Sequence, residues 1–186
     1  MNCIELMVEE HKSIKRMLAV IRRYCYKILK NEAVQFEDFY RIIDFVRNYA
    51  DKHHHGKEEN MLFNRMMHEL GSPAEKLVRH GMLVEHDLGR LYIQELELAV
   101  RKVIDGEDES RLDVISNAMS YTYLLHRHID KEDNVVFKYA SNNLSSAVIE
   151  ELNRECEKFE QDRTSTEVCQ KYSDMVRELE AKVLTK

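Results

Sequence analysis

Two histidine–carboxylate pairs with the same spacing are the residues of this sequence best suited to chemistry. Glu58 follows His54 by four residues, and Glu132 follows His128 by four residues. On a helix this spacing places both side chains of a pair on one face, one turn apart. An imidazole and a carboxylate presented together are good ligands for a metal ion. The two pairs predict either two metal ions or one site that both pairs share.

Each pair lies within a longer repeat. The matching segments are residues 54–63 (HHGKEENMLF) with 128–137 (HIDKEDNVVF), and residues 7–11 (MVEEH) with 82–86 (MLVEH). Each half of the chain therefore supplies one lone histidine, His11 or His86, ahead of its histidine–carboxylate pair. A repeat kept for packing alone would preserve apolar positions first, whereas this repeat preserves histidine, lysine, glutamate and asparagine. The pattern favours a chemical role.

The candidate ligands lie on helical faces that carry apolar side chains, which predicts that they are buried. A buried ionised carboxylate is costly without a partner, so a cation in the core would explain Glu58 and Glu132. The predicted metal ligands are His11, His54, Glu58, His86, His128 and Glu132. The other histidines lie off the apolar stripes and are interpreted as structural or surface residues, namely His53, His55, His68 and His126.

His80 is a further candidate ligand. It precedes His86 by six residues, which is off the same face of a regular helix. It lies close to the expected start of its helix, where a local bend would turn it inward.

The composition describes a globular protein with few helix breakers. The chain has 186 residues, of which 44% are hydrophobic and 33% charged, with one proline and five glycines. This scarcity of breakers favours long helices.

The net charge of −6 disfavours nucleic acid as a partner. The sequence shows neither a membrane-spanning run nor a signal-peptide pattern, and its four cysteines form no C-x-x-C pair, so we expect a cytoplasmic protein with reduced, mostly structural thiols.

Apolar periodicity predicts four long helices, at about residues 2–30, 36–70, 74–104 and 109–140. The sequence Gly71-Ser72-Pro73 separates the second from the third. Leu112 and Val135 are among the core candidates of the fourth helix. The fold class is therefore all-α: an antiparallel up-down four-helix bundle with a pseudo-two-fold repeat, plus one or more additional C-terminal helices.

The chain divides into a bundle, residues 1–140, and a C-terminal helical extension, residues 141–186. The extension has an amphipathic pattern from about residue 147 to residue 184, with a break near residues 163–166. It contains no histidine. We expect it to pack on the bundle or to form the contact of a homodimer.

The segments around the candidate ligands resemble the hemerythrin-like, or HHE cation-binding, family. The resemblance rests on residues 54–59 (HHGKEE), 82–90 (MLVEHDLGR) and 128–133 (HIDKED), and covers about residues 1–140. It implies a four-helix bundle around a non-haem di-iron centre. Carried over residue by residue, it implies His11, His54, His86 and His128 as ligands, with Glu58 and Glu132 bridging two irons.

Two departures separate this sequence from the oxygen-carrying hemerythrins. Met82 stands where they have the first histidine of a His-x-x-x-His pair in the third helix. Glu132 follows its histidine by four residues, whereas their last carboxylate follows by five and is usually aspartate. The departures disfavour simple reversible oxygen carriage. They make this site more similar to that of the branch of the family associated with reactive oxygen or nitrogen species and iron handling.

The resemblance implies two Fe ions with a solvent-derived oxo or hydroxo bridge and an exchangeable position. We expect the centre to bind and reduce O2 or a related small oxidant, such as peroxide or NO, with electrons from an unknown donor. The alternative is an iron-storage, iron-delivery or O2, redox or NO-sensing module without turnover.

Tyr121, seven residues before His128, is a candidate for hydrogen bonding to a bound ligand, or a core tyrosine. Gly89 either leaves room for ligand entry or permits close helix packing.

Overall fold

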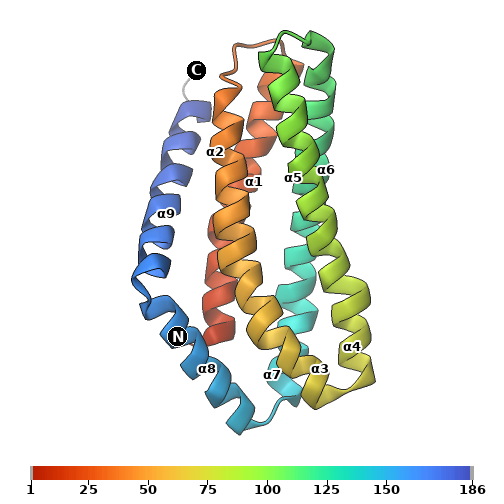
Figure 1. Ribbon diagram of the computed structural model, residues 1–186, viewed down its shortest axis with the longest axis vertical. Helices are drawn as coiled ribbons and strands as arrows, with labels where there is room; N and C mark the ends of the chain where they lie inside the picture. Colours follow the sequence, from red (N-terminus) through yellow and green to blue (C-terminus); the bar gives the residue numbers. More distant parts are fainter. Residues whose placement is uncertain (1, 185–186) are drawn as a thin grey trace.

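The described residues form a bundle of four long helices with two further helices along it (Figure 1). The computed structural model describes residues 2–184, without the side chains of residues 163, 164 and 184. Within this range the regular elements are all helical, and the bundle helices run alternately up and down. The predicted all-α bundle with additional C-terminal helices is confirmed.

The first two bundle helices differ in regularity. The first is α1 (Cys3–Leu29), an uninterrupted α-helix. The second begins as α2 (Glu37–Phe45), continues through two π-helical segments, η1 (Val46–His55) and η2 (Glu58–Phe63), and ends as α3 (Asn64–Leu70). In a π-helix the hydrogen bonds run from i to i+5, so each turn holds more residues than an α-helical turn.

The third and fourth bundle helices contain shorter π-helical segments. The third consists of α4 (Ser72–Leu77), η3 (Val78–Met82) and α5 (Leu83–Ile104). A single 3₁₀ turn, η4 (Asp108–Ser110), precedes the fourth. The fourth consists of α6 (Arg111–Lys131), η5 (Glu132–Val136) and α7 (Phe137–Asn143), and so extends three residues beyond the predicted end at residue 140.

Local sequence accounts for where the helices start and stop. Asn2 caps α1 by accepting a hydrogen bond from the backbone N–H of Glu5 at 2.9 Å, and the Glu5 carboxylate accepts from the backbone N–H of Asn2 at 3.0 Å. This reciprocal pair is a capping box. Gly71 ends α3 with φ of 67°, a conformation that glycine adopts without strain.

Two apolar clusters lie on either side of a polar layer inside the bundle. Along α1, for example, Met7 belongs to one cluster and Ile14 to the other, with His11 between them. The same order holds on the fourth helix, where Leu125 and Val136 belong to different clusters and Glu132 lies between them. All four bundle helices therefore bring their polar residues to one level, which packed side chains close off above and below.

Leu112 and Val135 do not lie in the core, contrary to the sequence-based expectation. Their exposed fractions are 67% and 53%. Leu112 lies in the first turn of α6, close to the end of the bundle. Val135 lies within η5, where the wider turn changes the face on which each residue emerges, and its neighbour Val136 is buried instead.

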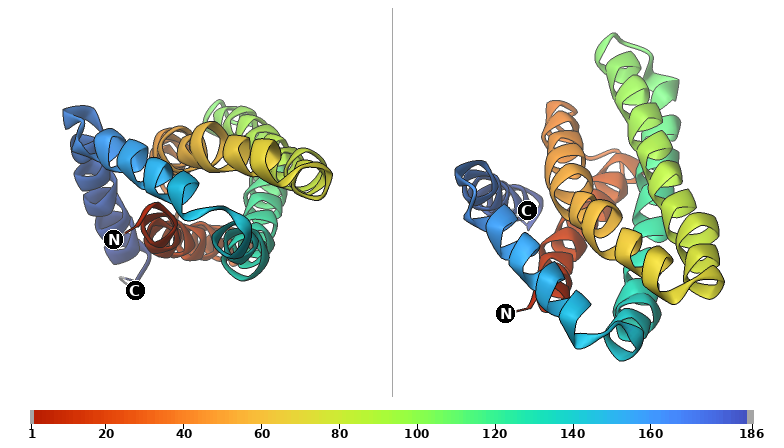
Figure 2. Two further views of the ribbon diagram at one scale, coloured as in Figure 1. Left: turned by 90° about the horizontal axis from the view of Figure 1, so that it is seen from below. Right: turned by 60° about the horizontal axis from the view of Figure 1, so that its bottom comes forward.

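The C-terminal extension packs against the bundle. It consists of α8 (Ser146–Gln161) and α9 (Arg163–Leu184). Figure 2 shows α8 passing across the end where α1 begins, and α9 runs beside α1 and α2. The α9 side chains of Tyr172, Val176 and Leu179 join the larger apolar cluster. None of the described helices combines the length and apolarity that crossing a membrane would need.

Candidate metal centre

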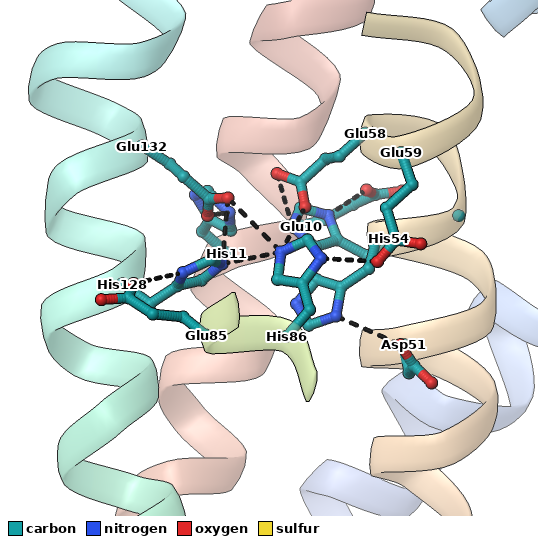
Figure 3. Close-up of polar contacts among 12 residues, drawn as sticks. Glu10, His11, Asp51, His54, Glu58, Glu59, Glu85, His86, His128 and Glu132 are labelled. Carbon is teal, nitrogen blue, oxygen red and sulfur yellow. Dashed lines mark hydrogen bonds and ion pairs between the residues drawn. The ribbon is translucent and has the colours of Figure 1, made fainter. Parts of the chain in front are cut away.

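The six predicted ligands meet in the polar layer of the bundle (Figure 3). One comes from α1, two from the second helix, one from α5, and two from the junction of α6 and η5. Each has an exposed fraction of 2% or less. The residues are His11, His54, Glu58, His86, His128 and Glu132.

His55 joins them, although the sequence pattern assigned it to the surface or to a structural role. Its side chain is buried and stacks on His86, with ring centroids 3.8 Å apart and an interplanar angle of 5°. The potential ligand atoms fall into two groups that share Glu58. One group comprises His11, His54, Glu58 and Glu132, and the other His55, Glu58, His86 and His128.

His80 lies away from both groups. It is exposed in η3, while Met82, two residues later, is buried in the apolar cluster that contains Met7. The fifth histidine of the layer is therefore His55. His53 is buried outside the layer, and His68 and His126 are exposed.

The two carboxylates each face both groups of histidines. Glu58 approaches His54 Nε2 with Oε1 at 3.5 Å and His86 Nε2 with Oε2 at 3.6 Å. Glu132 approaches His128 Nε2 with Oε1 at 3.0 Å and His11 Nε2 with Oε2 at 3.4 Å. A carboxylate with one oxygen toward each group is placed to bridge two cations.

Most of these inward-facing atoms have no hydrogen-bond partner among the described residues. They are the Nε2 atoms of His11 and His54 and all four oxygens of Glu58 and Glu132. Buried polar atoms are normally paired, because an unpaired one loses its hydration without compensation. The Nε2 atoms of His86 and His128 lie only 3.0 Å apart. Such a converging set of acceptor atoms fits a cation.

Each of the five histidines has a carboxylate on its outward nitrogen. When Nδ1 donates to a carboxylate, the neutral ring keeps a lone pair on Nε2, which is the atom that points inward. The pairs, from Nδ1 to oxygen, are His11–Asp133 at 2.7 Å, His54–Glu10 at 2.8 Å, His55–Asp51 at 3.3 Å, His86–Glu59 at 2.6 Å and His128–Glu85 at 2.9 Å.

A cationic side chain in turn contacts each of these outer carboxylates. Lys15 lies 3.3 Å from Asp133, Lys57 bonds Glu10, and Lys131 bonds Glu85. Arg90 serves two carboxylates, since its Nη2 lies 2.7 Å from both Asp51 Oδ1 and Glu59 Oε1. The contacts fix the carboxylates, and the carboxylates fix the ring orientations.

This arrangement explains why the sequence repeat includes residues that are not ligands. Lys57 and Lys131 occupy equivalent repeat positions and bond the equivalent glutamates, Glu10 and Glu85. The asparagines of the repeat also act alike, since Asn60 and Asn134 each donate to the backbone carbonyl four residues earlier, at 2.8 and 3.0 Å. The repeat contains ligands, their orienting carboxylates and the cations behind them.

The fifth histidine breaks the repeat. The position equivalent to His55 holds Ile129, which is buried in the larger apolar cluster, the one that contains Ile14. Alignment of the two halves could therefore not identify His55. The available signal was the unusual run of three histidines at positions 53–55, which ends the π-helical segment η1.

The π-helical turns account for both His54 and His55 reaching the layer. On a regular α-helix two neighbouring residues point about 100° apart, so only one of them would face the interior. In the wider turns of η1 and η2, the angle between neighbouring side chains is smaller than in an α-helix, and the face on which each side chain emerges is shifted. π-helical turns inside α-helices are frequently found at functional sites.

Burial sets the protonation of the metal-free site. It lowers the pKa of His54 to about 4, so this ring is neutral and available as a ligand near pH 7. Burial, together with the nearby Glu132 carboxylate, raises the pKa of Glu58 well above its usual range. Burial opposes charge on His128, yet Glu132 raises the pKa of this histidine to about 9. Burial opposes charge on Glu132 as well, but the neighbouring histidines, His128 first, hold the pKa of Glu132 well below its usual range.

A cavity of about 260 Å³ lies next to the second group of ligands. His55, His86 and Tyr121 line it. Arg47 and Arg90 also line it, and because these two side chains are partly exposed, the cavity reaches the surface beside them. Tyr121 is 2% exposed, and its hydroxyl has no hydrogen-bond partner among the described residues.

Gly89, one of the cavity residues, leaves space without being required for packing. A Cβ atom there would lie 3.5 Å from Tyr121 Cε2 and 3.6 Å from Leu125 Cδ2, both ordinary contact distances. The helices therefore do not need glycine to approach each other at this point.

A third cluster of metal-binding residue types, His53, Glu160 and Cys169, lies on the outer side of η1. The ammonium of the fully buried Lys57 lies within it, 3.2 Å from His53 Nε2 and bonded to Glu160. A fixed cation in that position opposes a second one. This cluster is an ion-pair network that joins α8 and α9 to the bundle.

Comparison with known proteins identifies one family. A sequence model described as the Hemerythrin HHE cation binding domain matches residues 2–140. No curated protein and no solved structure matches the chain. The matched residues include every histidine and carboxylate of the polar layer, while α8 and α9 lie beyond the match.

Proposed function

Since this chain belongs to the hemerythrin family of HHE cation-binding domains, we propose that its polar layer holds two iron ions and that the loaded protein binds and reduces a small oxidant. O2, peroxide and NO are the candidate ligands. Imidazole and carboxylate ligands suit iron, and a second iron allows two electrons to be delivered at one place.

One observation carries this proposal: buried acceptor atoms with no hydrogen-bond partner converge in the layer, with two carboxylates facing both groups of histidines. In our assignment His11 and His54 serve one ion, and His55, His86 and His128 serve the other. Glu58 and Glu132 would be shared between the two ions. Five histidines and two carboxylates leave coordination positions for solvent or a small ligand.

The protein's own part in the reaction is to hold these donors and to admit the ligand. The outer carboxylates keep the Nε2 lone pairs directed inward, and the apolar clusters exclude bulk water from two sides. We assign the cavity beside His55 and His86 as the entry path. The Tyr121 hydroxyl would donate a hydrogen bond to a ligand that enters there. Electrons must come from a donor outside this chain.

Metal content and an optical spectrum test the proposal. The protein is reduced under anaerobic conditions, analysed for metal, and measured again after air is admitted. We expect about two irons per chain and new ultraviolet and visible absorption in air. Glu58→Ala and Glu132→Ala should each lower the iron content, with His126→Ala as the matched control. Full iron loading and an unchanged spectrum in both glutamate variants would refute the bridging assignment.

Oxygen consumption separates turnover from storage or sensing. With a chemical reductant present, a reductase consumes O2 or peroxide far beyond the iron content of the sample. A single uptake in proportion to iron, followed by no further consumption, would leave iron handling or sensing as the function. Absence of bound metal would exclude both.

A further inference from the structure

Two cysteines from distant parts of the chain line one surface cavity, away from the polar layer. The cavity has a volume of about 540 Å³ and lies between the start of α1 and the last turns of α8. Cys3 contributes from α1 and Cys156 from α8. Their exposed fractions are 3% and 2%, so both residues are buried at the wall of this cavity.

A backbone contact fixes the two cysteines relative to each other. The backbone N–H of Cys3 donates to Asn153 Oδ1 at 2.9 Å. Asn153 precedes Cys156 by three residues, which places both on one face of α8. Both cysteines also pack into the same apolar cluster as Met7 and Leu152. The start of α1 is therefore held against the part of α8 that carries Cys156.

The two thiols influence each other's ionisation. The interaction with Cys156, and then burial, raises the pKa of Cys3. The same interaction lowers the pKa of Cys156. Burial opposes this effect, and the positive charge of Lys57 adds to it. A pair of this kind loses its first proton more easily than its second. Thiolate, rather than thiol, is the form that attacks peroxide.

We propose that Cys3 and Cys156 are a dithiol site that hydrogen peroxide oxidises to a disulfide. A thiolate sulfur attacks one peroxide oxygen and breaks the O–O bond, giving a sulfenic acid and, with one proton, water. The second thiol attacks the sulfenic sulfur, so that the S–S bond forms, the S–O bond breaks and a second water leaves. Two thiols and one peroxide thus give one disulfide and two waters, with both sulfurs oxidised and both oxygens reduced.

The disulfide would connect the first turn of the bundle to the extension. In the reduced protein noncovalent contacts join these elements, among them the Cys3–Asn153 hydrogen bond. The crosslink would make this attachment covalent under oxidising conditions. It requires neither metal nor the proposed reductase activity.

Peptide mapping tests the proposal on the full-length protein. Reduced protein is exposed to hydrogen peroxide, denatured in N-ethylmaleimide and digested with trypsin. Each cysteine falls in its own peptide, namely residues 1–12, 24–27, 155–158 and 164–171. We expect residues 1–12 linked to 155–158, at the summed mass less two hydrogens, on chains that run as monomers in a non-reducing gel. Cys25 should remain fully alkylated.

Variants and metal removal make the result decisive. Cys3→Ser and Cys156→Ser should each abolish the linked peptide, while Cys25→Ser and Cys169→Ser should retain it. The link should form equally in metal-loaded and chelator-treated protein, which separates this site from the metal centre. Recovery of both cysteines in alkylated form, a link between two chains, or a link that requires metal would each overturn the proposal.

Discussion

At the scale of single residues, the site consists of histidines whose two nitrogens have different partners. Nδ1 faces a carboxylate in all five, and Nε2 faces the interior. His55 follows this rule through Asp51, at a longer Nδ1–oxygen distance of 3.3 Å. His80 does not, because its side chain is exposed.

Replacing His55 should therefore weaken metal binding, whereas replacing His80 should not. We expect His55→Gln to bind iron at least about tenfold more weakly, since even the loss of an outer-shell partner commonly costs that much. His80→Gln is the matched control. Iron content after competition with a chelator measures the difference. Equal retention by the two variants would remove His55 from the ligand set.

Tyr121 should affect the ligand more than the metal. Tyr121→Phe removes a buried hydroxyl that has no hydrogen-bond partner, so the metal-free protein should be as stable as before or slightly more stable. Iron content should not change. Affinity for NO should fall by roughly two- to tenfold, the equivalent of one hydrogen bond of about 0.5–1.5 kcal/mol. An unchanged NO affinity would leave Tyr121 as a packing residue.

At the scale of helices, the sequence predicted the number, order and approximate limits of the elements. Apolar periodicity and the break at Gly71 were sufficient, because each bundle helix buries one stripe. The pattern assumes a uniform helical turn, however. It therefore misplaced His55 and Val135, which lie in π-helical segments where neighbouring residues emerge on other faces. The repeat could not correct His55, because Ile129 occupies its equivalent position.

The course of α5 beside the cavity allows a test of the entry path. Gly89→Ala adds a methyl at ordinary contact distance and should stabilise the helix, by up to about 1 kcal/mol. Gly89→Leu adds a side chain large enough to reach into the cavity. We expect slower association of NO in the leucine variant alone, measured by stopped-flow absorption. Equal association rates in both variants would place the path elsewhere.

At the scale of the whole molecule, the extension contributes to the core as well as to the surface. Residues of α9 join the larger apolar cluster, and Glu160 of α8 pairs with the buried Lys57. Lys57 contacts Glu10, which orients His54. The extension is thus connected to the surroundings of a proposed ligand through two ion pairs, although it lies outside the matched family domain.

A core substitution in α9 should therefore destabilise the entire protein. Leu179 is fully buried, and Leu179→Ala should lower the free energy of unfolding by about 2–5 kcal/mol. Leu112→Ala, at a position that is 67% exposed, should change it by no more than about 0.5 kcal/mol. Urea unfolding of the metal-free variants provides the comparison. A small effect of Leu179→Ala would show that α9 unfolds independently of the bundle.

The presence of Ile129 at the repeat position equivalent to His55 has a consequence for the choice of metals in the proposed site. In the assignment proposed above, one site has three imidazoles and the other has two. The two sites would then differ in affinity, and also in which ion each prefers, since divalent metals rank differently on nitrogen-rich and oxygen-rich ligands. Filling should then be sequential, with the three-histidine position occupied first. Supplied with iron and manganese together, such a scaffold would be expected to sort them and form a heterometallic pair.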